Sequence, residues 1–172
     1  MHRVAILGLG NVLMGDDALG PYAVRLFEAE YHVPDSATVQ DLGTPGLDLV
    51  PHLADVHAVI LLDTVRSAGT AGELRLYRRD EILEHPPQPR VSPHDPGLKE
   101  ALLALAFSGQ GPREVLLIGV IPQSTAQGIG LSAPVAAALP AVQAEIVREL
   151  ERLGCPATRR AVPSSPDIWW ER

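Results

Sequence analysis

Cysteine is scarce in this sequence, and long apolar runs and an excess of positive charge are missing from it. Cys155 is the single cysteine, so no internal disulfide can form. No run of about 18 apolar residues occurs, which argues against a helix that spans a membrane. Acidic residues outnumber basic ones by 21 to 14, and the net charge of −7 disfavours nucleic acid and anionic membranes as partners. The N-terminal apolar run reads as part of the fold, not as a signal peptide, so we expect a cytoplasmic protein.

What is present is a chain of 172 residues, 46% of them hydrophobic, which suits one globular domain. Strand-like and helix-like patterns alternate along it, which is typical of an α/β sandwich around a mostly parallel sheet. Strands are expected over residues 4–9, 38–42, 58–63, 72–77 and 114–121. Helices are expected over residues 18–31, 46–54, 98–107 and 133–153, the last kinked or restarted at Pro140.

The domain is expected to cover residues 1–155, followed by a tail over residues 156–172 that is rich in proline and serine. The tail shows no apolar periodicity, so we expect it to be extended or mobile, and truncation after Gly154 to leave folding nearly intact. Trp169 and Trp170 are the counter-argument, because two adjacent tryptophans could dock on the domain.

The stretch GLGNVLMGDDALG, from Gly8 to Gly20, directly follows an apolar run and resembles a phosphate-binding turn. A dinucleotide fingerprint needs a third glycine where Leu13 stands, and the leucine side chain should block the close approach of helix and strand. A P-loop needs lysine and a hydroxyl residue where Asp16 and Asp17 stand, and these carboxylates would repel phosphate. The loop therefore suits a cation, unless the two aspartates only cap the following helix.

Two further residues are expected at the same edge of the sheet. Asp63 ends an apolar strand, and ligands of parallel sheets bind beyond the carboxyl ends of the strands. His94 lies in VSPHDPGL, just before an expected helix. Asp63 could instead bond a turn, and His94 could be an ordinary surface histidine. Taken together, the carboxylates and the imidazole suit a divalent metal with nitrogen and oxygen ligands, nickel or zinc included.

Five motifs resemble, in the same order, those of the [NiFe]-hydrogenase maturation endopeptidases. They are GLGNVLMGDDALG, DLGTPGLDL, VILLDTV, VSPHDPGL and GVIPQSTAQGIGLSAPV, which together span the chain to about Cys155. The resemblance implies an α/β fold, a three-layer sandwich with a twisted, mostly parallel five-stranded sheet flanked by helices. It also implies an endopeptidase, aspartic-type by class, that removes the C-terminal extension of a hydrogenase large-subunit precursor after nickel insertion.

The resemblance assigns both the catalytic and the metal-binding roles to Asp17, Asp63 and His94. Their metal would be the nickel carried by the precursor, and no organic cofactor is implied. Asp16 matches the acidic residue that precedes the first ligand, and Ala18 stands where many members have glycine. The turn at residues 43–46 would bring its backbone near the substrate, or else be a plain tight turn.

The residues leave the mechanism open. Water could be activated by a metal or by a carboxylate, and Asp17 and Asp63 could share a proton if they lie close together. The alternatives to this protease are a non-enzymatic nickel-binding chaperone of the precursor and a zinc metallopeptidase with its own metal. The expected partner is the large-subunit precursor, with no nucleic acid and no membrane, and a monomer is favoured.

Overall fold

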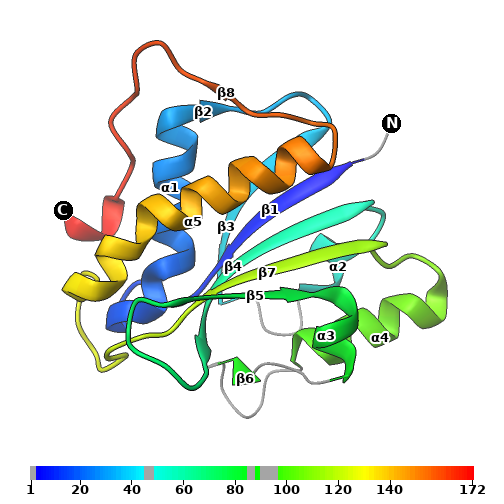
Figure 1. Ribbon diagram of the computed structural model, residues 1–172, viewed down its shortest axis with the longest axis horizontal. Coiled ribbons are helices and arrows are strands. Elements are labelled where there is room, and N and C mark those ends of the chain that lie inside the picture. Colours follow the sequence, from blue (N-terminus) through cyan, green and yellow to red (C-terminus); the bar gives the residue numbers. More distant parts are fainter. Residues whose placement is uncertain (1–2, 45–48, 85–87, 90–96) are drawn as a thin grey trace.

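A computed structural model of the protein describes residues 3–44, 49–84, 88–89 and 97–172 (Figure 1). Its centre is a sheet in the order β3-β1-β4-β7-β5. The strands of this path are β1 (Val4–Leu9), β3 (Ala37–Gly43), β4 (Ala58–Arg66), β5 (Leu74–Arg78) and β7 (Glu114–Val120). The first three and β7 run parallel, while β5 pairs antiparallel with β7 at the edge. The mostly parallel sheet expected from the sequence is confirmed, and a two-residue strand, β6 (Gln88–Pro89), pairs with the end of β4.

Helices cover both faces of this sheet, which makes three layers (Figure 1). The helix α1 (Leu19–Glu30) and the long helix α5 (Ala133–Arg152) pack on one face. The short helices α2 (Leu49–Leu53) and α3 (Arg79–Glu84), with α4 (Leu98–Ser108), pack on the other. The helix α5 continues through Pro140, so no new helix begins there.

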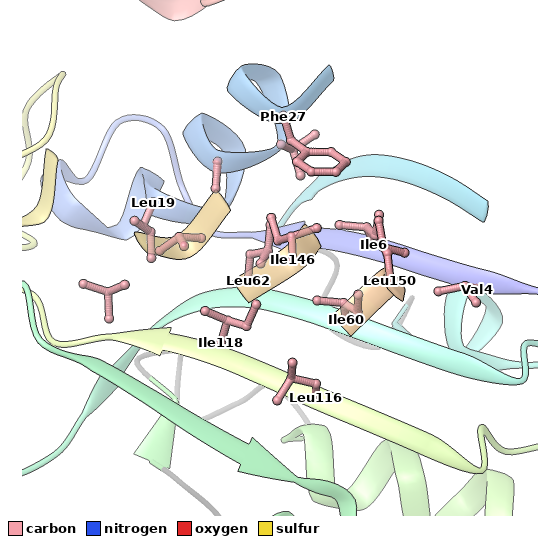
Figure 2. Close-up of a cluster of buried hydrophobic side chains, with 14 of the residues drawn as sticks. Val4, Ile6, Leu19, Phe27, Ile60, Leu62, Leu116, Ile118, Ile146 and Leu150 are labelled. Atoms are coloured by element: carbon pink, nitrogen blue, oxygen red, sulfur yellow. The ribbon is translucent and has the colours of Figure 1, made fainter. Parts of the chain in front are cut away.

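Strand β4 shows how the two apolar layers are built. Ile60 and Leu62 point to the face of α1 and α5, where Figure 2 shows them among Phe27, Ile146 and other apolar side chains. Leu61 points to the opposite face, under α2 and α4, because successive side chains of a strand alternate between faces. Nearly all of β4 is buried, which explains why its sequence is a continuous apolar run.

The strand order places a switch point beside β1. The chain leaves β1 through α1 to reach β3 on one side, and later returns through α2 to form β4 on the other side. Loops that leave neighbouring strands in opposite directions open a crevice at their carboxyl ends, where ligands of open α/β sheets bind. The loop after β1 and the end of β4 therefore bound the natural ligand position of this fold.

Gly20 lets α1 approach the sheet closely, which corrects the expectation that Leu13 would block such an approach. A Cβ added at Gly20 would lie 2.3 Å from the carbonyl oxygen of Leu9 and 2.5 Å from that of Leu62. Leu13 is 53% exposed and lies outside this contact. The glycine that the contact needs stands in the first turn of α1, not at the third position of a dinucleotide fingerprint.

The segment after Cys155 packs on the domain instead of extending away from it. A short strand, β8 (Thr158–Arg159), pairs with β2 (Tyr31–His32), and a final 3-10 turn, η3 (Trp169–Glu171), follows. Trp170 is 4% exposed and packs edge-on against Tyr22 of α1, with 4.9 Å between the ring centroids. The expectation of an extended or mobile tail is therefore wrong for β8 and for Trp170, which are held against the domain.

None of the helices in the described part of the chain combines the length and the apolarity that crossing a bilayer requires.

Candidate functional site

The acidic loop leaves the carboxyl end of β1 and enters α1 through a 3-10 turn, η1 (Gly15–Ala18). Asp16 and Asp17 lie inside this turn. Met14 occupies the N-cap position of η1 and Ala18 that of α1, and neither helix start has a side-chain cap hydrogen bond. The alternative that these aspartates serve as helix caps is therefore wrong, and each needs another explanation.

Asp17 is half-buried and is held from two sides. The backbone N–H of Asn11 donates to its Oδ2 at 2.8 Å, and the hydroxyl of Thr64 donates to its Oδ1 at 3.5 Å. Thr64 directly follows Asp63 in β4. The long second contact leaves Oδ1 weakly bound, so this oxygen has capacity for another partner.

Asp63 lies near the carboxyl end of β4 and is 5% exposed. Its Oδ1 accepts the backbone N–H of Thr64 at 2.7 Å, which is the local turn-like bond that the sequence left open. By the alternation of the strand, Asp63 belongs to the face of Leu61 and Val65, while Thr64 turns to the face of α1 and bonds Asp17. Asp17 and Asp63 thus reach the same end of β4 from the two faces of the sheet.

The third expected ligand, His94, lies outside the described residues. Within the described part of the chain, no three side chains of histidine, cysteine, aspartate or glutamate are arranged to hold a metal ion. The structure therefore supplies two carboxylates, those of Asp17 and Asp63, at one sheet edge.

Asp16 has a different role from its neighbour. It is 1% exposed, and its two oxygens accept hydrogen bonds from the backbone N–H groups of Gln123, Ser124 and Ser132 and from the Ser132 hydroxyl, at 2.6–3.0 Å. Burial alone would raise the pKa of Asp16, but these hydrogen bonds outweigh it and hold the pKa below its usual value. Asp16 is therefore an ionised tether between the acidic loop and the loop that follows β7.

Backbone contacts tie the same two loops together at a second point. The N–H of Gly15 donates to the carbonyl of Gly128 at 2.9 Å, and the N–H of Gly128 donates to the carbonyl of Leu13 at 2.9 Å. Leu13 and Ile129, beside these bonds, are 53% and 58% exposed. The motif GVIPQSTAQGIGLSAPV thus supplies the partner loop of GLGNVLMGDDALG, a contact that no periodicity in the sequence indicates.

The turn after β3 also contacts the acidic loop. The N–H of Gly10 donates to the carbonyl of Gly43 at 2.7 Å, and Gly43 has a φ of 58°. Pro45 and Gly46 of this turn lie outside the described residues. The expectation that its backbone approaches a substrate stays a prediction.

A cleft of about 310 Å³ opens where β4 and β7 separate. The two strands pair up to Thr64 and Val120, after which Ile121 turns to bond Glu73. We call this space the fork cleft. Its lining residues are Val65, Arg66, Ser67, Ile121, Pro122, Gln123, Ser124 and Thr125.

Sequence reasoning missed the fork cleft and Arg66. The one available signal was a charged residue at the end of an otherwise apolar strand, three positions after Asp63.

Comparison with known proteins finds relatives that match across most of the chain. A family model described as hydrogenase maturation protease matches residues 21–149. The chain is 34% identical over 158 residues to the hydrogenase 2 maturation protease of Escherichia coli (strain K12), across 92% of this chain and 96% of that protein. It is 38% identical over 138 residues to the hydrogenase expression/formation protein HoxM of Azotobacter vinelandii, across 80% of this chain and 67% of that protein. The solved structure of the hydrogenase maturating endopeptidase HybD from E. coli is similar with a TM-score of 0.84 and 32% identity, across 92% of this chain and 98% of that one.

Proposed function

The chain belongs to the hydrogenase maturation protease family, and from that premise we propose that it removes the C-terminal extension of a [NiFe]-hydrogenase large-subunit precursor after nickel has been inserted. The observation that carries the proposal is the placement of Asp17 and Asp63 at the carboxyl ends of β1 and β4, beside the switch point of the sheet. In a chain of this family, two carboxylates at that position suit a cation presented by the substrate.

The nickel of the precursor is the group that Asp17, Asp63 and His94 would bind. Carboxylate and imidazole are ligands that nickel accepts. A precursor without nickel lacks these bonds, so it should not dock productively. The protease would in this way distinguish a finished metal centre from an unfinished one, without a resident metal of its own.

Hydrolysis also needs an activated water and a polarised carbonyl. A carboxylate at this edge could act as the general base, or the substrate's nickel could polarise the reacting groups. The aspartic-type class rests on family resemblance. Asp63-Thr64 is not matched by a second Asp-Thr-Gly-like copy in the sequence, and Asp17 and Asp63 reach the edge from opposite faces.

The position of the site also suits a protein substrate. Leu13 and Ile129 expose apolar side chains on the two loops that Asp16 joins, next to Asp17. Apolar side chains at the rim of a site are typical of surfaces that contact other proteins. We expect the protease to work on the precursor as a cytoplasmic monomer.

Incubation of the purified protein with nickel-loaded and nickel-free precursor tests the proposal. We expect the extension to be released from the nickel-loaded form only, seen as a mobility shift and as a released peptide by mass spectrometry. Binding with no change in length would indicate a chaperone. Cleavage of both forms, with loss of activity when the protein's own metal is removed, would indicate a zinc metallopeptidase.

A further inference from the structure

We propose that the fork cleft binds the first residues of the precursor's extension, and that Arg66 pairs with a carboxylate of that segment. The proposal rests on the proposed function, because the extension exists only in a hydrogenase precursor. It adds a specificity site, and a residue that reads it, to the carboxylates that would bind nickel.

The position of the cleft follows from the register of the sheet. Asp63 pairs with Gly119 and Thr64 with Val120, and beyond these pairs β4 and β7 separate. The cleft therefore begins within two residues of Asp63. Nickel stays with the retained part of the subunit, so the peptide on the released side of the scissile bond must lead away from the nickel ligands. The fork between the two strands is a path that starts at those ligands.

The lining of the cleft suits a short stretch of polypeptide. Val65 and Ile121 are buried and provide an apolar base, while Gln123, Ser124 and Thr125 provide amide and hydroxyl groups along one side. A volume of about 310 Å³ is at the lower end of the range for binding sites, enough for a few residues but not for a folded partner.

The wall of the cleft is fixed before any ligand arrives. The backbone N–H groups of Gln123 and Ser124 donate to the buried carboxylate of Asp16 at 2.8 and 3.0 Å. A wall held in this way loses little conformational freedom on binding, which favours affinity. The same tether joins the wall to the loop that carries Asp17.

Arg66 is the one charged side chain among the described residues that line the cleft. It is exposed, and within the described part of the chain its guanidinium makes no hydrogen bond or ion pair. The guanidinium of an arginine can form two parallel hydrogen bonds with one carboxylate, and such a pair is stronger than a hydrogen bond to a neutral acceptor. In a chain of net charge −7, an exposed arginine beside the candidate site selects for an anionic group locally, against the overall charge.

The test uses nickel-loaded precursors that carry either aspartate or lysine at each of the first three positions after the scissile bond, which mass spectrometry of the released peptide locates. The wild-type protein should cleave the aspartate form with a kcat/KM about tenfold above the lysine form at one of these positions. Arg66→Gln should bring this ratio close to one. Arg66→Glu should invert it.

Arg113→Glu is the matched control. Arg113 is also an exposed arginine, but it lies just before β7, at the opposite end of the strand from the cleft. The Arg113→Glu variant changes the net charge by the same amount as Arg66→Glu, and it should keep the wild-type preference for the aspartate form over the lysine form. The inference is overturned if the wild-type protein cleaves the precursors and folded Arg66→Glu keeps the wild-type ratio at all three positions. If the wild-type protein cleaves no nickel-loaded precursor, the proposed function itself fails and the inference falls with it.

Discussion

Ser132 donates two hydrogen bonds to Asp16, from its backbone N–H to Oδ1 at 2.6 Å and from its hydroxyl to Oδ2 at 2.8 Å. These bonds join residues 116 positions apart and bring the loop after β7 against the acidic loop. In each of the four hydrogen bonds described above, the Asp16 side chain is the acceptor and its partner is the donor. A carboxylate satisfies them all, but a carboxamide presents its own NH₂ group to at least one donor.

Asp16→Asn is therefore expected to destabilise the protein by roughly 1–3 kcal/mol, because it leaves buried donors without an acceptor. Thermal or urea unfolding measures this loss. Asp80→Asn is the control, since the Asp80 side chain is 86% exposed and its contact with Arg79 is 3.9 Å long. Equal unfolding free energies for Asp16→Asn and wild type would contradict the role of Asp16 as a buried tether.

Asp17→Asn should stay folded and lose cleavage of nickel-loaded precursor by roughly 100-fold or more, the scale of losing a catalytic group. The Asn side-chain oxygen can still accept the N–H of Asn11, so the loop keeps its bond while the charge disappears. A gel mobility assay of the precursor, run beside a thermal melt, separates activity from stability. His94→Ala should show the same loss of cleavage with a stable fold. Normal cleavage by folded Asp17→Asn would remove Asp17 from the proposed nickel site.

Trp170→Ala is expected to lower the unfolding free energy by roughly 3 kcal/mol, because it removes a large side chain buried against Tyr22 and Ala18. Trp169→Ala is a matched control, since Trp169 is 53% exposed and should cost much less. Truncation after Gly154 should then cost at least as much as Trp170→Ala. A truncated protein that melts at the wild-type temperature would show that the docked tail contributes nothing to the domain.

Glu149 gives the protein a predicted sensitivity to acid. Burial would raise its pKa, but hydrogen bonds and charges from Arg152 and Arg78 outweigh it and bring the pKa to about 2. A carboxyl whose folded pKa lies below its unfolded value stabilises the fold above the unfolded value of 4.5, and this contribution is lost as pH falls toward 2.

Glu149→Gln should remove this acid-dependent part of the unfolding free energy, measured by urea unfolding between pH 7 and pH 2. At pH 7 it should cost roughly 1–3 kcal/mol, limited because both arginines are nearly half exposed. Glu145→Gln is the control, because the ion pair that Glu145 makes within the described part of the chain is with the exposed Arg148, three residues on. A Glu149→Gln curve parallel to wild type over the whole acid range would contradict the assignment.

The apolar strands were the part of the fold that the sequence predicted best. The bounds of β1 match the expectation, and β4 and β7 were placed to within a few residues, because buried parallel strands are continuous apolar runs between turns. The strand pair β2 and β8 was missed. It has two residues on each side and joins segments far apart in the sequence, so no local pattern marks it.

For the site, the sequence could place Asp17 after β1 and Asp63 at the end of β4, since the edge of a parallel sheet is defined by where its strands end. It could not separate Asp16 from Asp17. Both are aspartates in one turn, and only the loop after β7 makes one a buried tether while the other faces Thr64. Arg66 was missed for the same reason, because the fork cleft exists only once β4 and β7 separate.

The hydroxyl of Tyr22 donates to Glu171 across 149 positions, and the neighbouring Trp170 packs against the same ring. During synthesis, α1 therefore leaves the ribosome long before Trp170 and Glu171, the residues that cover Tyr22, exist. The ring of Tyr22, one turn from the acidic loop, must wait for nearly the whole chain to emerge before it is covered. We therefore expect a nascent chain stalled before residue 170 to bind nickel-loaded precursor less well than the released protein, even with every proposed nickel ligand already synthesised.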